Sequence, residues 1–97
     1  MSNVKIISDQ EDSAELVRTA VLAELKRLAL ALSKTDKIIN QLEKRHNIAS
    51  DVFLKDASAD ELRGGDEEYV QWSGELQLRK RIIEDIQKLK SIEYVHN

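Results

Sequence analysis

The feature that most constrains the fold is an uninterrupted helix-favouring stretch that follows Asp12 and continues to Asn47. It contains no Pro and no Gly, and Asp12 with Glu15 three residues later fits the acidic form of a capping box. Asn47 can end the helix because Asn tolerates the left-handed backbone conformation. A helix over about 13–46 would be about 50 Å long at about 1.5 Å per residue. A rod of that length cannot form the centre of a compact 97-residue globule, so it must pack against a similar rod.

A second long helix is predicted over about 66–94. Asp66 is a suitable N-cap, and the two glutamates that follow it would complement the helix dipole. Apolar residues follow one slowly drifting face of this helix: Tyr69, Trp72, Leu76, Ile82, Ile83, Ile86 and Leu89. Gly74 lies within it, and we expect close approach of the facing helix to explain this residue. The sequence therefore predicts an all-α fold, a long antiparallel helical hairpin within a single domain over 12–97.

The connector over 47–65 is predicted to be a short helical corner. Ser50 would cap one turn, and the Gly64-Gly65 pair would end another. Apolar residues of the connector and of the second helix would hold this corner together, namely Phe53, Leu62, Tyr69 and Trp72. The leader over 1–11 contains a short strand-like run, Val4–Ile7, and is expected to be flexible or to form a strand that could pair with another chain.

The first helix is too apolar for one partner helix. Most residues from Leu16 to Leu32 are apolar, whereas one facing helix covers a stripe of a little over about 100°. A second buried face is therefore expected, in a homodimeric four-helix bundle or in a complex with another protein. Val17, Leu22 and Leu30 are the predicted contacts with the partner chain.

Composition removes several classes of function. The chain has no Cys, so it has neither disulfides nor a Cys-ligated metal, and no signal-peptide pattern follows Met1. Its longest uncharged apolar run is far too short to span a bilayer, and we expect a cytoplasmic protein. The net charge of −3 gives no nucleic-acid footprint.

No catalytic, cofactor-binding or metal-binding residue is assigned, and we expect a non-enzymatic protein. An alternative is an all-α metal-dependent nucleotide hydrolase, in which carboxylates on facing helices hold Mg²⁺. The acidic residues available are mostly at predicted helix starts, where capping explains them: Asp60, Glu61, Asp66, Glu67 and Glu68. His46 and His96 are far apart in a hairpin. Trp72-Ser73-Gly74 matches the tripeptide of the secreted WXG hairpin proteins, a further alternative, but falls inside a predicted helix instead of a turn.

Residues from about 42 to 90 resemble a loose family of small helical proteins common in archaea and cyanobacteria. The matching residues are His46-Asn47-Ile48, Ser50, Phe53-Leu54, Leu62-Arg63-Gly64-Gly65-Asp66, Glu68-Tyr69 and Trp72. This chain has one Gly more before the Asp than the family pattern. Some members look like antitoxin partners of small toxins, so the resemblance implies a protein that binds and occludes another protein.

Overall fold

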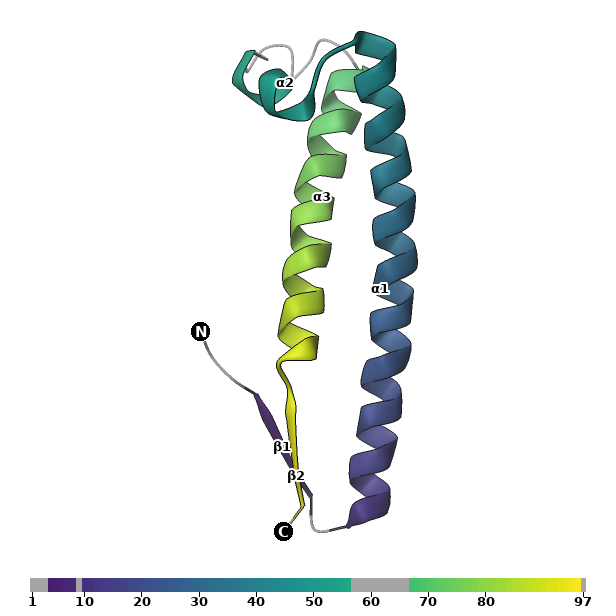
Figure 1. The fold of residues 1–97 in the computed structure, drawn as a ribbon, viewed down its shortest axis with the longest axis vertical. Helices are drawn as coiled ribbons and strands as arrows, with labels where there is room; N and C mark the ends of the chain where they lie inside the picture. Colours follow the sequence, from purple (N-terminus) through teal and green to yellow (C-terminus); the bar gives the residue numbers. More distant parts are fainter. Residues whose placement is uncertain (1–3, 9, 57–66, 97) are drawn as a thin grey trace. The chain divides into compact units, whose positions relative to one another are not determined.

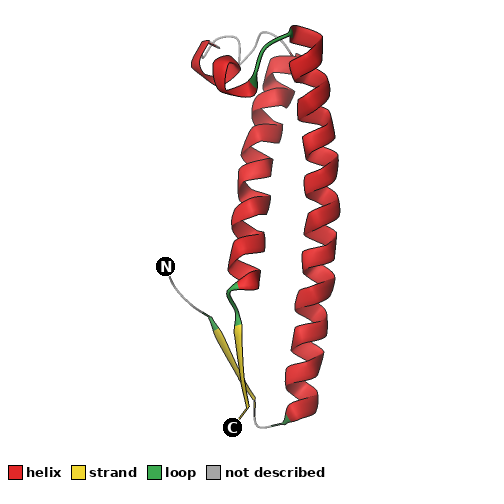
Figure 2. Cartoon of the chain, in the orientation of Figure 1, coloured by secondary structure: helices red, strands yellow, loops and turns green. Residues whose placement is uncertain are grey.

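The computed structural model describes residues 4–8, 10–56 and 67–96 (Figure 1). Its elements are β1 (Lys5–Ser8), α1 (Glu11–His46), α2 (Ser50–Asp56), α3 (Glu67–Lys90) and β2 (Glu93–His96). The long helix α1 packs on α3, which confirms the predicted helical hairpin. The chain is mostly helical, as predicted, and it also carries the two short strands drawn in yellow in Figure 2. The chain divides into two compact units, unit 1 (Met1–Ala31 with Ile82–Asn97) and unit 2 (Leu32–Arg81).

The C-terminal end of α1 forms as the sequence predicted. Asn47 adopts a left-handed conformation with φ 52°, and the Ile48 amide donates to the Glu43 carbonyl at 3.2 Å. These are the left-handed residue and the closing hydrogen bond of a Schellman motif. Three basic residues occupy the last turn, where the helix dipole favours positive charge: Lys44, Arg45 and His46.

The N-terminal end of α1 differs from the predicted capping box. The helix begins at Glu11, and the Ala14 amide donates to the Gln10 carbonyl at 3.3 Å, so Asp12 lies in the first turn. The Glu15 carboxylate accepts a hydrogen bond from Arg18 at 2.5 Å. Asp12 therefore contributes through the helix dipole, which favours a carboxylate in the first turn, and not as an N-cap.

Unit 2 is built around three buried side chains from three helices, Leu42 of α1, Phe53 of α2 and Trp72 of α3. The short helix α2 is fixed to both long helices. Its Ser50 amide donates to Glu43 Oε2 at 2.8 Å, and its Ser50 hydroxyl accepts from Trp72 Nε1 at 2.9 Å. The Ser50 side chain therefore joins α2 to α3, in place of the capping role predicted for it.

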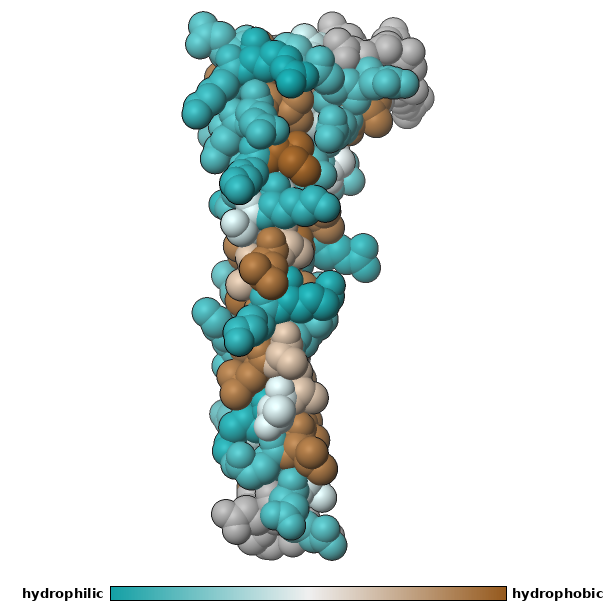
Figure 3. Space-filling view, turned by 90° about the vertical axis from the view of Figure 1, so that its right-hand side faces the viewer, coloured by the Kyte–Doolittle hydropathy of each residue, from teal (hydrophilic) through white to brown (hydrophobic). Residues whose placement is uncertain are grey.

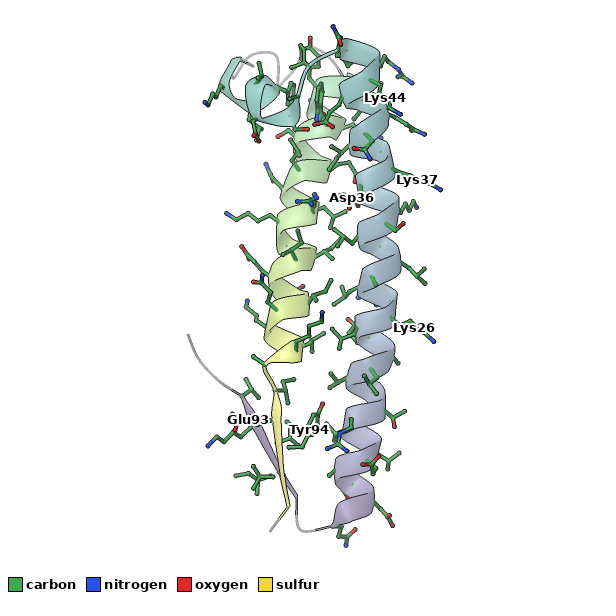
Figure 4. All side chains as sticks on the ribbon, viewed as in Figure 1. Lys26, Asp36, Lys37, Lys44, Glu93 and Tyr94 are labelled. Atoms are coloured by element: carbon green, nitrogen blue, oxygen red, sulfur yellow. The ribbon has the colours of Figure 1, made fainter. Side chains whose placement is uncertain are left out.

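Unit 1 joins the two ends of the described chain in a parallel two-stranded sheet. β1 pairs with β2 in the register Lys5↔Glu93 to Ser8↔His96, and the Glu93 amide donates to the Val4 carbonyl at 2.8 Å. The prediction of a helix to about residue 94 is therefore wrong, because α3 ends at Lys90. Residues 92–95, Ile-Glu-Tyr-Val, favour a strand once a partner strand is available. Tyr94 points toward α1, where the Arg18 guanidinium lies 4.8 Å from its ring centroid (Figure 4).

The explanation predicted for Gly74 is also wrong. A Cβ placed on this residue would meet nothing within 4 Å, so no neighbouring element approaches it closely. Gly74 is exposed inside α3, where glycine only adds backbone freedom to the unfolded chain.

Gly74→Ala is therefore expected to stabilise the protein by about 0.5–1 kcal/mol. Chemical denaturation followed by circular dichroism measures this change. The control is Gln77→Ala, at an exposed position in the same helix, which should change stability by less than about 0.5 kcal/mol. A loss of stability in Gly74→Ala would show that the space beside this residue is occupied.

Candidate functional site

The three predicted partner contacts do not lie on one face of α1. Leu22 and Leu30 are 60% and 71% exposed, but their separation of eight positions places them about 80° apart around the helix axis. Val17 is half-buried, on the side of α1 that carries the buried Leu28. The structure therefore leaves Leu22 and Leu30 available to a partner, and places Val17 largely within the protein's own packing.

Four exposed apolar residues recur along one side of α1, and they are here called the α1 stripe: Leu16, Ala20, Ala23 and Leu30. Leu16 is 73% exposed, and it was absent from the predicted contacts. Its signal in the sequence is the seven-residue spacing from Leu16 to Ala23 to Leu30, which returns to nearly the same face of a helix. Figure 3 shows the outward side of α1, where brown apolar patches alternate with teal polar side chains.

Two charged residues near the α1 stripe, Glu24 and Arg27, pair with each other within the helix. Arg27 donates two hydrogen bonds to the Glu24 carboxylate, at 2.6 and 2.8 Å. The hydrogen bond from Arg27 lowers the pKa of Glu24, and the same contact raises the pKa of Arg27. Lys26 points away from α3 on the outward side of the helix (Figure 4). The surroundings of the stripe therefore combine neutralised ion pairs with one outward-pointing lysine.

The residues predicted to hold the corner come together in unit 2. The Phe53 and Trp72 rings stack with centroids 4.1 Å apart and an interplanar angle of 3°, and Tyr69 meets Phe53 edge-on at 5.3 Å. Leu62, the fourth predicted member, falls outside the described residues. The His46 ring stacks on Trp72 with centroids 5.6 Å apart, a contact that sequence reasoning missed. Trp72 has no exposed surface, so its ring serves the packing of unit 2.

A groove of about 420 Å³ in unit 2 is lined by residues of α1, α2 and α3, several of them polar. Three of its charged side chains make structural contacts. Arg79 donates to Asp36 at 2.7 Å, and the Glu43 carboxylate accepts the Ser50 amide. Asp36, Arg79 and Glu43 therefore hold the helices of unit 2 together.

The residues considered for the hydrolase and WXG alternatives are placed as follows. Asp60, Glu61 and Asp66 fall outside the described residues, whereas Glu68 contacts Arg45 and lies 3.5 Å from His46 Nε2. Among the residues that the structure describes, no three His, Cys, Asp or Glu side chains gather closely enough to hold a metal ion. Trp72-Ser73-Gly74 lies within α3.

No helix in the described parts of the chain is both long enough and apolar enough to cross a membrane. Comparison of the chain with family models, with curated proteins and with solved structures finds no match. The resemblance to the small archaeal and cyanobacterial proteins stays a prediction, and function is inferred from the chain's own residues and their geometry.

Proposed function

We propose that this protein is a non-enzymatic protein–protein interaction module and that the α1 stripe is its binding surface. The observation that carries the proposal is the exposure of Leu16 and Leu30, at 73% and 71%, on one face of a long helix. Exposed leucines that recur on one helix face are typical of a surface that a partner covers.

The α1 stripe is separate from the packing that holds unit 1 together. Leu28 is 5% exposed, and Leu30 follows it after a turn of about 200° around the helix axis. The buried face and the stripe therefore lie on nearly opposite sides of α1. Since the protein's own core uses the first face, the leucines of the second contribute little to folding and remain available for binding.

The sharpest form of this function is an antitoxin-like role, in which the stripe covers a surface that a toxin needs. The resemblance of residues 42–90 to proteins with that role supports it, and an amphipathic helix laid in an apolar groove is an established mode of recognition. The ion pairs beside the stripe would form the polar rim of such an interface.

The binding role can be tested by placing the photo-crosslinking residue p-benzoylphenylalanine at position 30 in living cells. We expect discrete adducts, whose masses show whether the partner is another protein or a second copy. Leu78 of α3, which is 44% exposed, provides a control position away from the stripe. Adducts no more abundant at position 30 than at position 78 would contradict the proposed binding surface.

The antitoxin-like form predicts rescue of growth when this chain is expressed with a toxic protein encoded by the adjacent gene. The variant Leu16→Glu/Leu30→Glu should lose that rescue, because each change buries a carboxylate against an apolar partner surface. Val52→Glu, at an exposed position in α2, should retain it. Full rescue by the double variant would exclude occlusion through the stripe.

A further inference from the structure

The spacing of the α1 stripe is symmetric about Ala23. Leu16 lies seven residues before Ala23, and Leu30 lies seven residues after it. If a second α1 ran antiparallel across this point, each Leu16 would lie opposite Leu30 of the other copy, and the two Ala23 residues would meet at the two-fold axis. An interface between identical chains related by a two-fold axis must be self-complementary in this way.

The residue at the crossing point also suits such a pair. Ala23 is exposed and carries only a methyl group, so two helix backbones can approach closely there. Larger side chains on either side, Leu16 and Leu30, would then fill the space where the helices diverge. Leu22 lies to one side of the stripe and would stay outside the contact.

Charge decides the direction of the second helix. Asp12 lies eleven residues before Ala23 and Lys34 lies eleven after it, and both are exposed. An antiparallel pair centred on Ala23 therefore sets Asp12 of each copy opposite Lys34 of the other. A parallel pair would instead set Arg27 and Lys34 against the same residues of the second copy, which is unfavourable.

From these features we propose that the partner bound by the α1 stripe is a second copy of this chain, held antiparallel to the first with Ala23 at the two-fold axis. The inference rests on the proposed function, because it uses the same surface. It differs from the four-helix bundle expected from the sequence, since only α1 meets its counterpart. Two leucines from each copy make a small contact, so the dimer should form in a concentration-dependent way.

Single cysteines test the register directly, because the chain contains none of its own. Under mild oxidation Ala23→Cys should give a disulfide-linked dimer, since this bond requires the two Cβ atoms to lie within about 4.5 Å. Leu22→Cys is the matched control, next to Ala23 on the same helix and also exposed, and its dimer yield should be several-fold lower. Mixing Leu16→Cys with Leu30→Cys should give mainly the mixed dimer.

The outcomes separate the possible arrangements. Self-linked dimers of Leu16→Cys and of Leu30→Cys in place of the mixed product would show a parallel pair and overturn the inference. Equal yields from Ala23→Cys and Leu22→Cys would overturn it as well. If position 30 nevertheless gives photo-adducts with a different protein, the interaction role stands and only its assignment to a second copy fails.

A charge exchange provides a measurement that needs no cysteine. Asp12→Lys should raise the dissociation constant of the dimer by about three- to tenfold in analytical ultracentrifugation, because two cations then face each other. The double variant Asp12→Lys/Lys34→Asp should restore it, since the opposite charges are exchanged. A dissociation constant that stays unchanged in Asp12→Lys, or is not restored in the double variant, would contradict the antiparallel register.

Discussion

Replacement of Trp72 by Ala is expected to lower the free energy of unfolding by about 3–5 kcal/mol. Trp72 is fully buried, its ring stacks on Phe53 at 4.1 Å and on His46 at 5.6 Å, and its Nε1 donates to Ser50. The change leaves a large cavity where α1, α2 and α3 meet and removes the hydrogen bond that ties α2 to α3. Urea denaturation followed by circular dichroism measures the loss without relying on tryptophan fluorescence.

Two milder variants divide this effect between packing and hydrogen bonding. Ser50→Ala removes the acceptor and leaves the indole N–H buried without a partner, which should cost about 1–3 kcal/mol. Trp72→Phe keeps an aromatic ring against Phe53 and should cost less than Trp72→Ala. A Trp72→Ala protein of unchanged stability would show that the side chain is exposed in solution, contrary to the structure.

The local signals in the sequence predicted the long helices, the C-terminal end of α1 and the contact between Phe53 and Trp72. Asn47 ends α1 because its left-handed conformation lets the Ile48 amide donate to the Glu43 carbonyl, and this depends only on residues close together in the sequence. Phe53 and Trp72 were predicted to lie together because Phe53 is a large apolar residue of the connector and Trp72 lies near the start of the helix that follows it. Such features depend on neighbours in the sequence or on helix periodicity.

Contacts between distant segments could not be predicted in the same way. Residues 92–95 continue an apolar helical pattern, and only the parallel partner β1, at the other end of the chain, makes the strand favourable. Gly74 was assigned to a close helix approach because the sequence does not reveal which side of α3 faces α1. Part of the α1 stripe was missed for the same reason. Leu16 and Val17 are both apolar, and the sequence alone does not show which of them faces the buried side of the helix.

Leu28→Ala and Leu30→Ala should have very different effects, although the two leucines are two residues apart. Leu28 is 5% exposed, so its truncation should destabilise the protein by about 2–5 kcal/mol. Leu30 is 71% exposed, and its truncation in the dilute monomer should change stability by less than about 0.5 kcal/mol. Thermal and chemical denaturation of both variants at low protein concentration would measure the contrast. Equal losses would mean that α1 is rotated about its axis relative to the structure.

Melting temperatures measured at several protein concentrations distinguish the contribution of Leu30 to folding from its contribution to binding. A partner that binds only the folded chain adds to its stability by mass action, so a dimer becomes more resistant to unfolding as concentration rises. Leu28→Ala weakens the monomer itself and should lower the melting temperature at every concentration. Leu30→Ala should match the parent protein when dilute and fall below it when concentrated, because it removes only the contribution of the second copy. If the melting temperature of the parent protein does not depend on concentration, the second copy is not the partner, and the α1 stripe would bind a different protein.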